Sequence, residues 1–495
     1  MMEDIQWNKE GLYKLVKSKL GDSLFIVVSN REPYVHTTSE GKIKCTRPVG
    51  GLTEALDPVM RASGGTWVAQ GTGNADKKVV DEHNRIAVPP EKPEYTLRRV
   101  WLTEEEVNGF YLGFANQALW PLCHVTFTPP DYREEWWETY KKVNGIFANA
   151  VMDEVGNQKA VVLVQDYHFA LLSGYLKQRN PDLTVGQFWH IPWPAYESFR
   201  TCPWQKEILE GMLGNDLMGF HTRSFCDNFV DSVERGLEVT VDRKKSAIVR
   251  QGNTTVVEPF PISVDFNGLS AQSNTEAVEK EIVRIKKRYS LEGKYLGVGM
   301  DRMDYTKGIP ERLMALDKFL KDNPKYRGRV VFIQAGMPSR TKIDTYQKIG
   351  QRINRLIREI NKKYRTDTWK PVIPMQRQLS HDTLSALRCM ARFCVVSSLH
   401  DGMNLVAKEY VSARVDGDGV LILSKFTGAA VEMQDALLIN PYDIGEFATK
   451  IKEAVEMPEA ERRRRMKNMR GIVAGNNIYR WGGTMVDRLI SIAGV

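Results

Sequence analysis

Short apolar, β-branched runs separated by helical patterns recur along this chain, and this alternation restricts its possible folds more than any other feature. Strands that alternate with helices form parallel, doubly wound sheets, because parallel neighbours need a long crossover connection. We therefore predict an α/β protein. The predicted strands are residues 24–29, 160–164, 187–190, 296–300, 330–334, 371–374, 393–398, 420–424 and 436–439.

Two domains are expected, because 495 residues exceed the size at which one hydrophobic core stops growing. Residues 261–277 are polar, lack a hydrophobic period and separate two sets of predicted strands. We therefore predict domains at 1–262 and 263–474. Ligands of open parallel sheets bind beyond the carboxyl ends of the strands, so functional side chains should directly follow strands in both domains.

The net charge of +8, from 69 basic and 61 acidic residues, is spread along the chain. It suits small anionic substrates better than nucleic acid, which needs a concentrated basic stripe. The six cysteines form no C-x-x-C pair and no zinc spacing, and the chain has no apolar signal region near its start and no run of 18 apolar residues. These features predict a cytoplasmic protein without nucleic-acid or membrane partners.

The segment D-G-M-N-L-V-A-K-E-Y follows the predicted strand at 393–398 and is the strongest candidate site. A helix is predicted to start near Gly402, and its free N–H groups favour an anion such as phosphate. At about 1.5 Å rise per residue, Glu409 would lie roughly 12 Å from Asp401, which is close to the span from a sugar through a diphosphate to a ribose. An ordinary strand–turn–helix unit with acidic caps has the same pattern, and this segment alone does not separate the two interpretations.

Cations follow two further predicted strands. Arg302 and Lys307 precede a helix that opens at Pro310, and Arg340 follows the next strand. Fixed cations at the carboxyl ends of neighbouring strands would stabilise a departing diphosphate. Each could instead form a surface ion pair, but three together favour a site.

In the first half, polar and aromatic residues also follow predicted strands or glycine turns. Aromatic rings such as Trp120 serve equally in a core or against a sugar. The prolines after His190 keep the following backbone from turning helical and expose this residue. The candidates are Arg31, Gly50, Gly51, Tyr111, Trp120, Asp166 and His190.

Taken in order, these segments resemble the retaining glycosyltransferases of family 20, the trehalose-6-phosphate synthase family, over nearly the whole chain. The matching segments are S-N-R, G-G-L, L-W-P, D-Y-H, H-I-P-W-P, D-R-M-D-Y-T-K-G-I-P-E-R, P-S-R, D-G-M-N-L-V-A-K-E-Y, L-S-K-F-T-G-A-A and I-N-P-Y-D. The resemblance implies a GT-B fold, with two Rossmann-like domains facing a deep cleft and a last helix, about residues 475–495, packed back on the first domain. It also implies transfer of glucose from UDP-glucose to glucose 6-phosphate, with no cofactor and no metal.

Matched positions carry the family's roles onto this chain. Residues implied in catalysis are Asp166, His190, Arg302, Lys307 and Asp401. Residues implied in donor binding are Gly50, Gly51, His190, Arg302, Lys307, Asp401, Gly402, Met403, Asn404, Leu405 and Glu409. Residues implied in acceptor binding are Arg31, Tyr111, Trp120, Asp166 and Arg340.

The acceptor is less firmly predicted than the donor. The segment N-R-E-P-Y, residues 30–34, resembles the related glucosylglycerol-phosphate synthases, which use glycerol 3-phosphate, whereas Gly50 and Gly51 favour the trehalose branch. A different phosphorylated acceptor and a non-catalytic sugar-phosphate sensor are therefore alternative functions. A sensor need not retain a leaving-group site, so it is disfavoured by the intact Arg302, Lys307, Asp401 and Glu409. The sequence leaves open the donor base, regulation and whether the chain forms a homo-oligomer.

Overall fold

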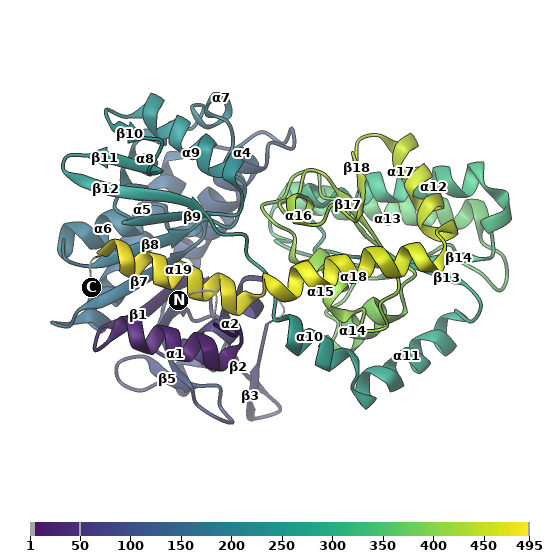
Figure 1. The fold of residues 1–495 in the computed structure, drawn as a ribbon, viewed down its shortest axis with the longest axis horizontal. Helices are drawn as coiled ribbons and strands as arrows, with labels where there is room; N and C mark the ends of the chain where they lie inside the picture. The colour runs from purple at the N-terminus through teal and green to yellow at the C-terminus, as the bar shows by residue number, and fades with distance from the viewer. Residues whose placement is uncertain (1–4, 49–50, 494–495) are drawn as a thin grey trace. The chain divides into compact units, whose positions relative to one another are not determined.

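The computed structural model describes residues 5–48 and 51–493, and the chain divides into two compact units. The first unit is the described part of Met1–Ile262 together with Ile478–Val495, and the second is Ser263–Asn477. Each unit has its own sheet with helices packed on it, as Figure 1 shows.

The first unit is built on a ten-stranded sheet in the order β10-β11-β12-β9-β8-β7-β1-β4-β6-β5. Its central strands are parallel, whereas β5, β10 and β11 run antiparallel to their neighbours. The strands are β1 (Leu24–Arg31), β4 (Thr66–Gln70), β5 (Arg85–Val88), β6 (Tyr95–Val100), β7 (Ala160–Gln165), β8 (Thr184–Phe188), β9 (Leu217–Phe220), β10 (Thr240–Asp242), β11 (Ala247–Arg250) and β12 (Asn253–Pro259), and a separate hairpin consists of β2 (Val35–Ser39) and β3 (Lys42–Thr46).

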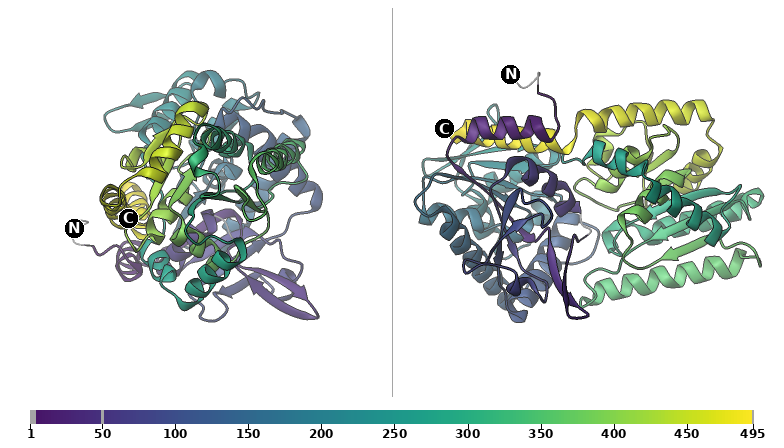
Figure 2. Two further views of the ribbon diagram at one scale, coloured as in Figure 1. Left: turned by 90° about the vertical axis from the view of Figure 1, so that its right-hand side faces the viewer. Right: turned by 90° about the horizontal axis from the view of Figure 1, so that it is seen from below.

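Strands β6-β4-β1-β7-β8-β9 follow the Rossmann order 3-2-1-4-5-6, which reverses direction between β1 and β7. All of β7 and nearly all of β1 are buried, as expected for strands covered on both faces. Figure 2 shows α1 and α19 on one side of these strands and other helices on the opposite side. The helices are α1 (Lys9–Leu20), α2 (Gly51–Ser63), η1 (Asp76–Lys78), α3 (Glu104–Glu106), the π-helix η2 (Val107–Leu119), α4 (Trp120–His124), α5 (Glu134–Val155), η3 (Tyr167–Phe169), α6 (Leu172–Arg179), α7 (Tyr196–Phe199), α8 (Gln205–Met212), α9 (Arg223–Gly236) and α19 (Ile478–Ala493).

The second unit is built on a six-stranded, fully parallel sheet in the order β15-β14-β13-β16-β17-β18. This is again the order 3-2-1-4-5-6, and it reverses between β13 and β16. The strands are β13 (Tyr295–Met300), β14 (Val330–Ala335), β15 (Val372–Met375), β16 (Phe393–Val396), β17 (Val420–Ser424) and β18 (Leu437–Ile439).

Helix contacts in the second unit fall into two sets, with α12, α13 and α17 in one and α10, α11, α14, α15 and α18 in the other. Helix α13 is amphipathic and buries Ile353, Ile357 and Ile360 at spacings of three and four residues. The helices are α10 (Phe266–Ser273), α11 (Glu276–Tyr289), η4 (Tyr305–Lys307), α12 (Ile309–Asp322), η5 (Pro324–Tyr326), α13 (Asp344–Tyr364), α14 (His381–Met390), α15 (Leu405–Ala413), α16 (Ala429–Glu432), α17 (Ile444–Glu456) and α18 (Glu459–Gly475).

Helix α10 lies inside the polar segment 261–277, where no helix was predicted. Asp265 caps it by accepting a hydrogen bond from the Gly268 N–H at 3.0 Å, and Ser270 donates to the Ser412 carbonyl at 2.9 Å. A local cap and a tertiary contact therefore stabilise α10, although its sequence has no hydrophobic period. Along the described residues, no helix is long and apolar enough to cross a membrane.

Gly308 joins the loop after β13 to α12, and it is a position that only glycine fits. Its φ is +60°, and an added Cβ would lie 2.0 Å from the Ser397 carbonyl oxygen. We predict that Gly308→Ala lowers the free energy of unfolding by about 2–4 kcal/mol, because a backbone atom has to move.

Gly328→Ala is the matched control, to be compared by urea unfolding. Gly328 has a φ of +83°, but nothing lies within 4 Å of its added Cβ. Only the left-handed backbone penalty of about 1–2 kcal/mol then applies. Equal losses in the two variants would mean that the contact with Ser397 is not limiting.

Candidate active site

The predicted site residues of each unit cluster at the point where its strand order reverses. In the second unit, Arg302 and Lys307 follow β13 and Asp401 follows β16. In the first unit, Arg31 ends β1 and Asp166 follows β7. These are the neighbouring strand ends that open a ligand crevice in a doubly wound sheet.

Lys307 and Asp401 join the two central loops of the second unit. The Lys307 Nζ lies 2.6 Å from the Asp401 Oδ2, and both side chains are largely buried. The same oxygen accepts hydrogen bonds from the Ser398 hydroxyl at 3.0 Å and the Asn404 amide at 3.1 Å. Asp401 is therefore held in place before any ligand binds.

The helix after Asp401 begins later than predicted. Helix α15 begins at Leu405 rather than near Gly402, because Asn404 adopts a left-handed conformation with a φ of +71°. Gly402, Met403 and Asn404 are buried in the turn, and the side chain of the N-cap residue Asn404 makes no capping hydrogen bond. A strained N-cap that leaves helix amides available is typical of an anion site.

Buried Asp304 gathers the three predicted cations of the second unit. Its carboxylate lies 3.5 Å from Arg340 and 4.0 Å from Arg302, and Arg340 also donates to the Tyr346 hydroxyl. Burial raises the pKa of Asp304, but the charges of Arg340, Arg302 and Lys307 outweigh burial and hold the pKa below its usual 3.8. With Asp401, two carboxylates lie among three cations at this point of the sheet.

A second buried network lies beneath the loop that carries Lys307. Arg312 is 1% exposed and donates to Asp301 at 2.7 Å, to Gln334 at 3.0 Å and to the Ser397 hydroxyl at 3.0 Å. The Ser397 hydroxyl in turn lies 3.1 Å from the Lys307 carbonyl oxygen. These bonds fix the backbone on which Lys307 stands.

Glu409 lies in the second turn of α15 and is 9% exposed. It forms an ion pair with Arg388 of α14, whose Nε has no hydrogen-bond partner among the described residues. Lys408, the residue before Glu409 in α15, is 1% exposed and forms an ion pair with Glu432. A carboxylate held beside a cation offers oxygen atoms that accept hydrogen bonds from hydroxyl groups.

Asp166 and His190 come together at the ends of β7 and β8. The Asp166 Oδ1 accepts the Tyr167 N–H at 2.9 Å and the His190 N–H at 3.2 Å, and Asp166 has a strained φ of +74°. The His190 Nε2 donates to the Gln165 Oε1 at 2.7 Å. Burial, with His221 and His168 nearby, lowers the pKa of His190 well below 6.5, so the ring is neutral at pH 7.

Tyr111 and Arg31 also meet in the first unit. The Arg31 guanidinium donates to the Tyr111 hydroxyl at 3.1 Å, and the Tyr111 ring stacks on His168 with centroids 5.7 Å apart. Trp120 is 5% exposed and packs on His124 with ring centroids 4.0 Å apart.

The π-helix η2 carries Tyr111 and ends where Trp120 begins α4. Within it, the Asn116 amide bonds to the Tyr111 carbonyl at 2.6 Å, and its oxygen accepts the Tyr167 hydroxyl at 2.9 Å. The π-helix is thereby tied to the turn that holds Asp166. Long π-helices are rare and occur at functional sites.

The two predicted glycines of the first unit differ in what can be said of them. Gly51 is the first residue of α2. Gly50 lies outside the described residues.

Several residues of these clusters were not singled out as site residues from the sequence. Asp304 and Arg312 stand inside the quoted motif D-R-M-D-Y-T-K-G-I-P-E-R, so their positions were visible but their burial was not. Arg388 and Gln165 carried no signal, because each acts through a partner far away in the sequence.

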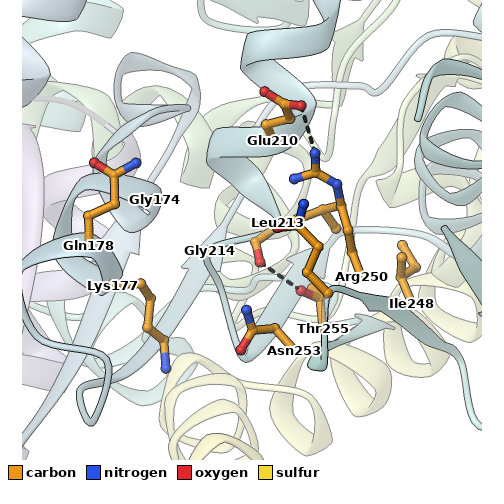
Figure 3. Close-up of a pocket in the computed structure, with 11 residues that line it drawn as sticks. Gly174, Lys177, Gln178, Glu210, Leu213, Gly214, Ile248, Arg250, Asn253 and Thr255 are labelled. Carbon is orange, nitrogen blue, oxygen red and sulfur yellow. Dashed lines mark hydrogen bonds and ion pairs between the residues drawn. The ribbon is translucent and has the colours of Figure 1, made fainter. Parts of the chain in front are cut away.

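A pocket of about 240 Å³ lies in the first unit between α6, α8 and the β11–β12 hairpin. Figure 3 shows Glu210 reaching Arg250 there, at 2.7 Å, and Lys177 pairs with Asp216 at 3.0 Å. None of the predicted site residues lines this pocket. Its cations are neutralised, so it offers no charge for an anionic substrate.

Comparison with known proteins shows which family the chain resembles. The family model described as glycosyltransferase family 20 matches residues 23–491. The trehalose-6-phosphate synthase of Mycobacterium bovis is 37% identical over 479 residues, which is 95% of each chain.

Solved structures agree with this match. A structure from E. coli bound with UDP-2-fluoro glucose superimposes with a TM-score of 0.84 at 28% identity, covering 94% of this chain and 99% of that one. A UDP-forming α,α-trehalose-phosphate synthase from Burkholderia xenovorans, in complex with glucose 6-phosphate, gives 0.85 at 29% identity, covering 94% of this chain and all (100%) of that one.

Two Rossmann-ordered units, together with the family match and the similarity to these solved structures, place the chain among the glycosyltransferases of the GT-B class. The chain belongs to glycosyltransferase family 20. The predicted α/β fold and the predicted family are both confirmed.

Asp304→Asn tests whether one buried carboxylate organises the cations of the second unit. The variant keeps the side chain's shape but leaves Arg302, Lys307 and Arg340 without a shared counter-charge. We expect the free energy of unfolding at pH 7 to fall by about 3–5 kcal/mol, because a buried partner is removed.

The pH dependence of this loss has a defined sign. The pKa of Asp304 is lower in the folded chain than in the unfolded chain, so the carboxylate stabilises the fold above about pH 4 and stops doing so as the pH falls through the folded value. Urea unfolding should show a constant gap between wild type and variant from about pH 5 to 8 and a shrinking gap below about pH 4. Asp317→Asn, which removes an exposed pair with Lys363 at 2.9 Å, is the control, and its expected loss is under about 1 kcal/mol. A fully stable Asp304→Asn would contradict the assignment.

Proposed function

We propose that this chain is an α,α-trehalose-6-phosphate synthase, which transfers glucose from UDP-glucose to glucose 6-phosphate with retention of configuration. The observation that carries the proposal is the cation cluster at the reversal point of the second sheet, where Lys307 pairs with Asp401 beside Arg302. The trehalose-6-phosphate synthase relatives, and the solved structures with UDP-2-fluoro glucose and with glucose 6-phosphate, support it.

The second unit is the proposed donor domain. Arg302 and Lys307 bind the diphosphate, the backbone amides of residues 402–405 bind phosphate and glucose hydroxyls, and Glu409 binds the ribose hydroxyls. Glu409 suits this role because its paired carboxylate accepts hydrogen bonds and donates none. Asp401 would orient both Lys307 and the transferred sugar.

The first unit is the proposed acceptor domain. The proposed ligands of the acceptor phosphate are Arg31, Tyr111, Trp120 and Arg340, of which Arg31 and Tyr111 are hydrogen-bonded to each other. Asp166 and His190 belong at the reaction centre, and His190 with Gly50 and Gly51 would also contact the donor. A neutral His190, whose Nε2–H is bonded to Gln165, can accept a hydrogen bond from a sugar hydroxyl at Nδ1 without adding charge.

The proposed reaction depends on electrostatic stabilisation of the leaving group. Negative charge grows on the β-phosphate as the glucose–oxygen bond breaks, and fixed cations lower the energy of that state more than they lower the energy of bound substrate. The departing phosphate oxygen accepts the proton of the incoming hydroxyl, and the new bond forms on the face that the phosphate left. No carboxylate is assigned as a covalent nucleophile.

Product formation with separate acceptors tests the function directly. We expect UDP release from UDP-glucose with glucose 6-phosphate and formation of trehalose 6-phosphate, identified by mass spectrometry. ADP-glucose and GDP-glucose are the donor controls, and glycerol 3-phosphate is the acceptor control. Turnover with glycerol 3-phosphate but not with glucose 6-phosphate would show that the proposed acceptor is wrong. No turnover with any combination of donor and acceptor would favour a non-catalytic sensor.

Lys307→Ala and Arg302→Ala test the leaving-group role. Each should lower kcat about 10²-fold or more, because charge stabilisation is lost in the transition state. Lys318→Ala, which removes an exposed pair within α12, is the control and should leave kcat unchanged. Near-normal kcat in the first two variants would refute the assignment.

A further inference from the structure

A buried charge cluster lies directly behind the turn that follows Arg31. Glu32 is 1% exposed, and both Asp76 and Arg99 are fully buried. Glu32 belongs to the segment N-R-E-P-Y, and the proposed function gives this residue no role. The cluster is therefore an unexplained set of ionisable groups next to a proposed substrate ligand.

Each member of the cluster bonds to a different segment of the first unit. The Glu32 carboxylate accepts the Arg99 Nε–H at 2.8 Å and the Thr72 N–H at 2.7 Å. Asp76 accepts the His36 N–H at 2.7 Å, and Arg99 donates to the Tyr34 carbonyl at 3.0 Å. The end of β1, the start of β2, the loop after β4, and β6 are thereby fastened together.

The charges in this cluster do not balance without a proton. Glu32 and Asp76 are two carboxyl groups that both accept the Thr72 N–H, and Arg99 is a single guanidinium that contacts both. His36 contributes no charge, since burial and the nearby Arg99 lower its pKa. Cys45 of β3 pairs with His36 across the hairpin, and its raised pKa keeps it a neutral thiol.

We propose that Glu32 is a positioning residue for acceptor binding: with Asp76 and Arg99 it fixes the backbone that presents Arg31 to Tyr111 and to the acceptor phosphate. Strand β1 is irregular between Ser29 and Arg31, so the regular ladder does not fix this turn by itself. The Glu32 carboxylate supplies the missing constraint. The inference rests on the proposed function, in which Arg31 holds the phosphate.

Ionisation of Glu32 should then weaken acceptor binding. Burial and the neighbouring Asp76 raise the pKa of Glu32 to about 7. Below this pH Glu32 is protonated and the turn is held. Above it, the negative charge of Glu32 repels Asp76 and loosens the turn that presents Arg31.

The experiment compares KM for glucose 6-phosphate in wild type and Glu32→Gln across about pH 6 to 8.5. Gln imitates the protonated side chain, so the two KM values should agree near pH 6. Near pH 8.5 the KM of wild type should be about tenfold higher than the KM of the variant. The ratio cancels titration of the substrate phosphate. The KM for UDP-glucose should not change, and Asp216→Asn, which removes a carboxylate paired with Lys177 in the same unit, should behave as wild type throughout.

A double-mutant cycle separates positioning from a general loss of structure. In an Arg31→Ala background, Glu32→Gln should no longer alter the pH profile of the acceptor KM, because Glu32 acts through Arg31. Identical profiles in wild type and Glu32→Gln, or a persisting effect without Arg31, would overturn the inference. Failure of the proposed function is distinct, because wild type would then show no turnover with glucose 6-phosphate at any pH.

Discussion

The ion pair between Lys307 and Asp401 is the interaction on which the candidate site of the second unit depends. It joins the loop after β13 to the loop after β16, at the one point where the order of this parallel sheet reverses. The buried Asp304 carboxylate interacts electrostatically with Arg340, Arg302 and Lys307. Arg312 fixes the backbone that carries Lys307 through the Ser397 hydroxyl. The cations are thus held in position before a ligand arrives, so little reorganisation is needed when charge develops on it.

The first unit has the same strand order, with different side chains at its reversal point. This point carries Arg31 after β1 and Asp166 after β7. Aromatic and neutral groups replace the cation cluster here, with Tyr111 against Arg31 and a neutral His190 beside Asp166. One fold, used twice, therefore presents a strongly charged site in one unit and a largely hydrogen-bonding site in the other.

The parallel strands of the second unit were predictable because each is a continuous apolar run. The strand at 420–424 has the predicted bounds, and that at 296–300 differs by one residue. Strands β9 to β12 were not predicted. Strand β9 is apolar but only four residues long, whereas β10, β11 and β12 contain polar residues that resemble loop sequence. Helix α15 begins at Leu405 and not near Gly402, because Asn404 adopts a left-handed conformation just before the helix. The sequence had suggested a turn at the glycine instead.

The site was predictable only where its residues stand in a motif. Residues that act through remote partners, such as Arg388 and Arg99, became visible only when folding brought them to Glu409 and Glu32. The long π-helix was equally hidden, since its i→i+5 pairing leaves no hydrophobic period of its own.

A crystal structure with UDP tests the central claim most directly, because that claim is a statement about where a nucleoside diphosphate binds. The account predicts the diphosphate against Lys307 and Arg302, the N-terminus of α15 at a phosphate oxygen and the ribose hydroxyls on Glu409. Nucleotide bound elsewhere, with Lys307 still paired only to Asp401 and Glu409 only to Arg388, would contradict it.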